Sequence, residues 1–124
     1  MKMADRVSIS LRARKSKGPV RKEEILEALG LEERVAAVSE DPPLSSARFE
    51  IGYGEAAGAL RKAAHWLMDQ RAEAFDQMRA TGLQLDLEIV MHFDEGRGSI
   101  VLPPALVVAC ARRELPVSVL VPAA

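Results

Sequence analysis

The sequence is poor in cysteine and in long apolar runs. Cys110 is the only cysteine among the 124 residues, so the chain forms no internal disulfide and offers no second thiolate for a structural zinc site. The first residues alternate polar with apolar side chains, unlike a signal peptide. No apolar run approaches the roughly 18 residues that a membrane-spanning helix needs. We therefore expect a cytoplasmic protein with no membrane contact.

Aromatic residues and net charge are also scarce, at 4% of the chain and a formal charge of −1. With 48% hydrophobic and 28% charged residues, the composition is that of an ordinary globular domain, whose core must be built mainly from aliphatic side chains. No internal repeat, low-complexity stretch or linker is visible, so we predict one domain over residues 1–124.

The charges are unevenly placed, because the N-terminal fifth of the chain is basic. Its cationic residues, opposed only by Asp5, are Lys2, Arg6, Arg12, Arg14, Lys15, Lys17, Arg21 and Lys22. One interpretation is a patch that binds nucleic acid or an acidic partner. The other, which we prefer, is a solvated edge strand that its charges protect from pairing with other chains.

Five segments alternate apolar with polar residues, the pattern of a strand with one buried face. They are residues 7–14, 47–53, 83–93, 99–102 and 117–121. In the second segment the apolar side comprises Ala47, Phe49, Ile51 and Tyr53. Residues 94–98 read as a hairpin loop between the third and fourth segments.

Three helices are predicted between these strands. The first begins at Pro19 and ends at Gly30, and the third runs from Pro103-Pro104 through Leu115. The second spans Glu55 to Ala80 before a stop at Gly82, and Arg71 interrupts its apolar stripe, so we expect a kink or a rolled-off end near residues 69–71. Residues 31–46 are expected to be irregular, with a helical turn or a short strand near residues 35–38.

The predicted element order is β-α-β-α-β-β-α-β. One-sided strands need helices on one face only, so the expected fold is an α/β protein of the α+β type. We predict a two-layer sandwich with a mixed or largely antiparallel sheet of about five strands.

Candidate chemistry is sparse. Gly52-Tyr53-Gly54 precedes a helix, a setting in which glycines can cradle a phosphate, but charged residues in the preceding strand favour a plain turn. Cys110 lies in an apolar stretch without a nearby base, so a core position is expected. His65 falls on the polar side of its helix. We predict no cofactor, no metal site and no assigned catalytic residue.

The polar sheet face is the one place where unlike charged side chains can meet. If the first three strands are neighbours, Arg12, Arg48, Glu88 and His92 share this face, together with Asp86. These residues form our candidate ligand-binding site. They would allow acid/base catalysis only if they converge in a pocket, whereas opposite charges on neighbouring strands also cover an ordinary solvated face.

Two further segments carry a resemblance to a known family. Residues 22–31, KEEILEALGL, follow the first strand, and residues 102–106, LPPAL, lead into a helix, Leu115 and a final short strand. This layout resembles a family of small bacterial domains of unknown function, some of whose relatives are grouped with immunity proteins of toxin systems. The resemblance spans nearly the whole chain. The family has no known reaction, so it implies no site residues here.

These observations lead to three functional hypotheses. We expect a non-enzymatic binding module whose partner is another protein or a second copy of the chain, with the immunity-like role as a narrower version. The alternatives are a small enzyme or ligand-binding domain that uses the polar sheet face, and nucleic-acid binding through the basic N-terminal stretch.

Overall fold

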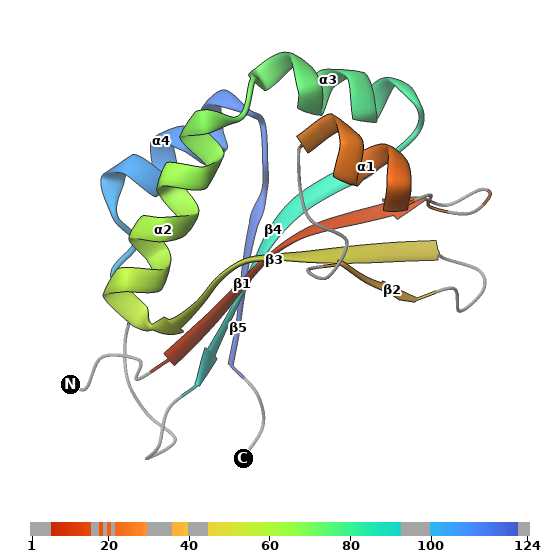
Figure 1. Cartoon of the computed structure of the whole chain (residues 1–124). Helices are drawn as coiled ribbons and strands as arrows, with labels where there is room; N and C mark the ends of the chain where they lie inside the picture. Colours follow the sequence, from red (N-terminus) through yellow and green to blue (C-terminus); the bar gives the residue numbers. More distant parts are fainter. Residues whose placement is uncertain are drawn as a thin grey trace.

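The computed structural model of the chain describes residues 6–15, 18, 20, 22–29, 36–39, 45–92 and 100–121. Helices and strands form two layers, with the helices gathered on one side of a mixed sheet, as expected for the α+β class (Figure 1). The elements are β1 (Arg6–Lys15), α1 (Lys22–Leu29), β2 (Ala36–Ser39), β3 (Ser45–Glu55), α2 (Ala56–Asp69), α3 (Ala72–Ala80), β4 (Gln84–His92), α4 (Pro104–Arg112) and β5 (Val117–Leu120).

The sheet has the strand order β2-β3-β1-β4-β5, with β1 at its centre. β1 runs antiparallel to both β3 and β4, and β2 runs antiparallel to β3. Only β4 and β5 are parallel, because α4 connects them as a crossover. The basic strand β1 is therefore not an edge strand, and our interpretation of its charges as edge protection is wrong.

The predicted element order is wrong in two places. A short strand, β2, occupies the connection that we expected to be irregular, at the position where a strand was one of two options. Residues 100–102 are not a strand, although Ile100 and Leu102 pack against the core. The alternation of apolar residues in this segment comes from this packing and not from strand pairing. The position beside β4 in the sheet is occupied by β5. The predicted hairpin loop, residues 94–98, lies outside the described residues.

The long helical segment is broken, as Arg71 predicted. Gln70 and Arg71 adopt extended backbone angles (φ −90°, ψ 137° and φ −73°, ψ 135°), so the segment divides into α2 and α3. Gly82, with a φ of +98°, follows the end of α3 as expected. Within the described residues, no helix is long and apolar enough to cross a membrane.

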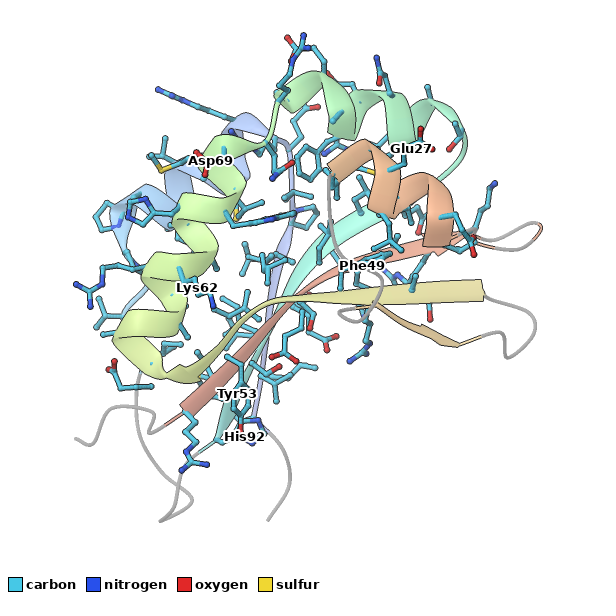
Figure 2. The ribbon with its side chains drawn as sticks, in the orientation of Figure 1. Glu27, Phe49, Tyr53, Lys62, Asp69 and His92 are labelled. Carbon is cyan, nitrogen blue, oxygen red and sulfur yellow. The ribbon has the colours of Figure 1, made fainter. Side chains whose placement is uncertain are left out.

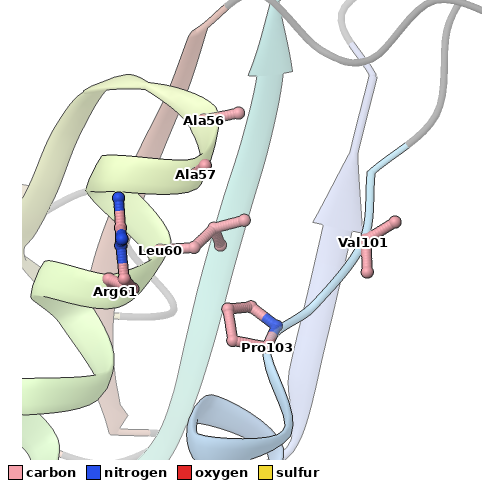
Figure 3. Close-up of a pocket in the computed structure, with 6 residues that line it drawn as sticks. All are labelled: Ala56, Ala57, Leu60, Arg61, Val101 and Pro103. Carbon is pink, nitrogen blue, oxygen red and sulfur yellow. The ribbon is translucent and has the colours of Figure 1, made fainter.

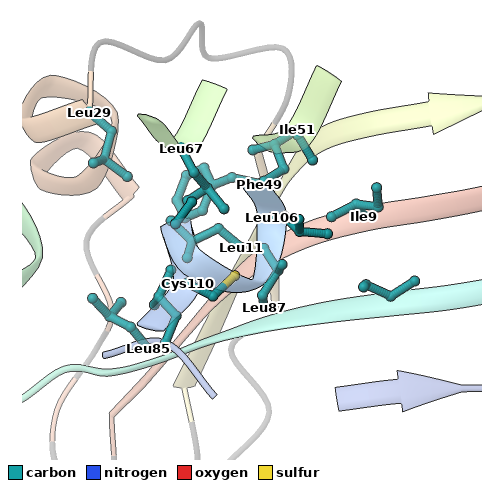
Figure 4. Close-up of a cluster of buried hydrophobic side chains, with 14 of the residues drawn as sticks. Ile9, Leu11, Leu29, Phe49, Ile51, Leu67, Leu85, Leu87, Leu106 and Cys110 are labelled. Carbon is teal, nitrogen blue, oxygen red and sulfur yellow. The ribbon is translucent and has the colours of Figure 1, made fainter. Parts of the chain in front are cut away.

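The core lies between the sheet and the helices. Val7, Ile9, Leu11 and Ala13 of β1 are fully buried, and side chains from both layers fill the same space (Figure 4). Aliphatic side chains dominate this core, as the composition predicted, and Phe49 and Phe75 are its largest members.

A β-bulge at Ile51 changes which face the end of β3 presents. Ile9 pairs with Gly52 and Ser10 with Glu50, so Ile51 is the extra residue. Tyr53 consequently lies opposite Ser8 on the polar face and is 57% exposed, and its predicted position on the apolar side is wrong. Gly52 instead faces α2, where an added Cβ would lie 2.8 Å from the carbonyl oxygen of Ala59.

Candidate functional site

Arginines and carboxylates from three strands meet on the polar sheet face. Arg12 of β1 lies opposite Arg48 of β3 on one side and Asp86 of β4 on the other. Its Nε donates to Asp86 Oδ1 at 2.9 Å and its Nη2 donates to Asp86 Oδ2 at 2.6 Å. This is the bidentate geometry that guanidinium and carboxylate groups favour.

The second carboxylate, Glu88, lies between two arginines. Arg48 donates to it through Nη1 at 2.6 Å and Nη2 at 3.3 Å, and Arg12 Nη1 is 3.1 Å from Glu88 Oε2. Arg14 adds a contact of 3.4 Å from its Nη2 to Asp86 Oδ2. We call these five residues, Arg12, Arg14, Arg48, Asp86 and Glu88, the arginine–carboxylate cluster.

Both carboxylates of the cluster are fully paired, although three arginines face two acids and Arg14 Nε has no hydrogen-bond partner among the described residues. Every carboxylate oxygen of Asp86 and Glu88 contacts a guanidinium nitrogen. The hydrogen bond from Asp86 raises the pKa of Arg12 above its ordinary value, against the opposing effect of burial. Glu88 is only 2% exposed. A general base needs a lone pair that faces substrate, so this arrangement is suited to holding strands together and not to proton transfer.

His92 does not join the cluster. It lies on the same face as Glu88 but four residues further along β4, a separation of about 13 Å at the rise of an extended strand. Its neighbour across the sheet is Arg6, and Tyr53 and His92 both lie toward the same end of the sheet (Figure 2). The structure thus brings together three of the four predicted site residues, Arg12, Arg48 and Glu88.

Exposed apolar side chains gather elsewhere, in the C-terminal part of the chain. Among the described residues, seven of the nine exposed large hydrophobic side chains fall between positions 101 and 121. They are Val101, Val107, Val108, Val117, Val119, Leu120 and Val121, and the other two are Tyr53 and Met68. Such a concentration on a small protein is typical of a binding surface.

Most of these residues belong to α4 and β5, which follow one another in the chain. α2 packs on β3 and β1 and also against α4, which lies behind α2 in Figure 1. As the crossover between β4 and β5, α4 lies beside α2, and it leaves Val117, Val119 and Leu120 of the edge strand β5 exposed. We call α4 and residues 117–121 the C-terminal margin.

The sequence contains a pattern that predicts an exposed apolar surface at this margin. Residues 104–111 form eight consecutive positions without a polar side chain. A helix that is apolar all round must be buried on every side or must meet another surface. α4 buries only Leu106, Ala109 and Cys110, so the valines between them face outward. The expectation that this stretch belongs only to the core is therefore wrong for Val107 and Val108.

A pocket of about 370 Å³ lies between the first turns of α2 and the segment that leads into α4 (Figure 3). Its lining is apolar except for Arg61, and comprises Ala56, Ala57, Leu60, Arg61, Val101 and Pro103. The adjacent helix start is already occupied, because the Glu55 carboxylate accepts hydrogen bonds from the backbone of Ala57 and Gly58 at 2.9 and 3.0 Å. The glycines before α2 therefore form a turn and a cap, and the phosphate interpretation loses its donors.

The surroundings of the remaining candidate residues do not form a reactive or metal-binding site. Cys110 is buried, as predicted, and burial raises the pKa of its thiol to about 11. His65 is exposed on α2. Within the part of the chain that the structure describes, no three side chains of His, Cys, Asp and Glu are close enough to hold a metal ion. Most of the basic N-terminal stretch beyond β1 lies outside the described residues.

Comparisons with models of protein families, with curated proteins and with solved structures found no match to this chain. The resemblance to the family with immunity-like relatives stays a prediction. Two surfaces of the structure bear on function, the arginine–carboxylate cluster and the C-terminal margin.

Proposed function

We propose that this protein is a non-enzymatic protein-interaction module that binds its partner through the C-terminal margin. The observation that supports this most directly is the concentration of exposed valine and leucine side chains on α4 and residues 117–121. The burial of such apolar surface against a partner lowers the free energy of the complex. Protein interfaces commonly have apolar centres of this kind.

The polar sheet face supports the same proposal indirectly. Both carboxylates of the arginine–carboxylate cluster are fully paired with guanidinium groups, so neither offers a free oxygen to accept a ligand's hydrogen bond or proton. Arg12 and Arg14 are paired with Asp86, which also removes two cations from a surface that would bind phosphates. Catalysis and nucleic-acid binding are therefore weaker explanations of this fold.

Site-specific photo-crosslinking tests the proposal in cells that make the protein. A photoreactive benzoylphenylalanine is placed at position 108, on the exposed side of α4, and in a matched variant at position 50, which is exposed on the polar face. We expect one discrete protein adduct from position 108 and none from position 50. An adduct from position 50 alone, or no adduct from either position, would contradict the proposal.

A further inference from the structure

Among the described strands, β5 is the edge of the sheet, and no other described strand pairs with its outer side. β4 and β5 are parallel, with Leu87 opposite Val117, and the Leu87 N–H donates to the Pro116 carbonyl at 2.8 Å. In a parallel ladder this bond is followed by bonds to every second residue, here Ser118 and Leu120. The N–H and C=O groups of Val117 and Val119 therefore point away from the sheet, and those of Val121 do so when the strand extends by one residue.

The outward backbone groups of β5 are spaced so that two copies of the strand can pair with each other. When two β5 strands run antiparallel about a twofold axis at Val119, Val119 pairs with Val119 of the second copy and Val117 pairs with Val121 of the second copy. All three outward residues then form hydrogen-bonded pairs, in which each residue exchanges both backbone bonds with its partner. A twofold axis requires such a self-complementary patch.

The side chains fit the same arrangement. Val117 and Val119 share the helix-covered face with Leu87 and Ile89, yet both remain exposed. Across the axis they would meet only valines, and β-branched pairs stabilise neighbouring strands. On the other face, Ser118 would lie opposite Leu120 of the second copy.

Charge separates this edge from the opposite one. No charged residue occurs from Leu115 to the end of the chain, so a symmetric pair brings no like charges together at its axis. The other edge strand, β2, is followed in the sequence directly by Glu40 and Asp41, and such charges commonly protect an edge from pairing. The uncharged edge thus fits a second copy, because neither chain brings a charged side chain of β5 to the axis.

We propose that two copies of this chain pair through antiparallel β5 strands, which joins their sheets into one continuous sheet with the axis at Val119. This inference depends on the proposed function, because it names the partner and the geometry at the same C-terminal margin. The exposed valines of α4 lie on the same margin and add apolar surface beside the joined strands.

Disulfide trapping of the purified chain tests the register. Paired residues at a hydrogen-bonded antiparallel position have Cα atoms about 5.5 Å apart, within the range of a disulfide. In a Cys110→Ala background, Val119→Cys should form a covalent dimer on mild oxidation, whereas Val117→Cys alone should not. A mixture of the Val117→Cys and Val121→Cys chains should cross-link. Cross-linking of Val117→Cys alone, without that of Val119→Cys, would overturn the register.

Sedimentation of the reduced protein tests the dimer itself. We expect wild type to be a dimer, and Val119→Lys to raise the dissociation constant at least about tenfold because two ammonium groups then face each other. Tyr53→Lys, on the polar face, should leave the dimer unchanged, and circular dichroism checks that each variant is folded. A monomeric wild type, or an unaffected Val119→Lys dimer, would overturn the inference.

The two proposals fail differently. A purified chain that is monomeric but forms an adduct with a different protein from position 108 overturns β5 pairing and leaves the interaction function in place. A monomeric chain without any adduct from that position overturns both.

Discussion

The arginine–carboxylate cluster shows how individual residues link three strands. Glu88 is nearly inaccessible to solvent, yet it is an acid, and burying a carboxylate is costly unless donors surround it. Arg12 and Arg48 supply those donors from β1 and β3, while the half-exposed Arg48 side chain remains in contact with water. The charges therefore fix the pairing of β3, β1 and β4 from the face that the helices do not cover.

Removing Glu88 should destabilise the protein clearly. Glu88→Ala leaves Arg48 without its carboxylate and deprives Arg12 of one of two partners. Breaking a buried ion pair costs about 3–5 kcal/mol, and the exposure of Arg48 reduces this here to about 2 kcal/mol. Urea unfolding measures the loss. Glu50→Ala, at an exposed position of β3, is the matched control and should change stability by less than about 0.5 kcal/mol.

Gly52 is a second residue whose role depends on its surroundings. It allows the backbone of β3 to approach α2, where a Cβ would collide with the Ala59 carbonyl. We expect Gly52→Ala to lower the free energy of unfolding by about 1–3 kcal/mol, because the helix must move away from the sheet. Gly58→Ala, whose Cβ would lie 3.1 Å from a side-chain oxygen of Glu55 and near no backbone atom, is the comparison. Equal losses in both variants would argue against a specific close approach at Gly52.

At the scale of elements, two arginines hold the elbow between α2 and α3. Arg113, at the end of α4, donates to the carbonyls of Met68 and Gln70 at the end of α2, and to Ala109 in its own helix. In return, Arg79 of α3 donates to the carbonyls of Arg113 and Glu114. Each guanidinium satisfies carbonyl groups that a helix end leaves unpaired, so α2, α3 and α4 are fastened to one another.

Replacing Arg113 should loosen this elbow more than the rest of the fold. Arg113→Lys keeps the charge but not the planar donor set that reaches several carbonyls, so we expect a loss of about 2 kcal/mol. Hydrogen exchange should increase most in α3 and at the end of α2. Arg112→Ala, an exposed neighbour, is the control and should change neither quantity. Uniformly faster exchange over all elements would contradict a local role.

At the scale of the whole molecule, the described helices leave the β5 edge of the sheet exposed. α2 covers β3 and β1, and α4 lies beside α2, but the valines of β5 remain exposed. The apolar strand β5 therefore lies at the opposite end of the strand order from β2. This asymmetry is the physical basis of the proposed dimer.

Global stability should depend on the ionisation of Cys110 at high pH. Burial raises the pKa of this thiol from an ordinary 9.0 to about 11, so the folded state holds its proton more tightly than the unfolded state. The contribution is fully present below pH 9 and is lost as the pH rises through 11. The difference between these two pKa values corresponds to about 2–3 kcal/mol of the free energy of unfolding. Denaturant unfolding from pH 8 to 11 should show a steeper decline for wild type than for Cys110→Ala, and parallel declines would contradict this assignment.

Local patterns in the sequence determined much of the secondary structure. Alternation in residues 7–14 and 83–93 predicted β1 and β4, and the arginine in an apolar stripe predicted the break between α2 and α3. These features were predictable because side-chain direction repeats with a local period of two or about 3.6 residues. The meeting of Arg12, Arg48 and Glu88 followed from the same alternation once β1 lay between β3 and β4.

Only the tertiary structure decided which segments pair and which surfaces stay open. The bulge at Ile51 moves Tyr53 to the other face of the sheet. The strand that pairs with the free side of β4 is β5 and not residues 100–102. The outward valines of α4 and β5 depend in the same way on which neighbours cover them. Which strands pair and which side chains are buried depends on contacts between segments that are distant in the chain. A local periodicity of the sequence contains no information on these contacts.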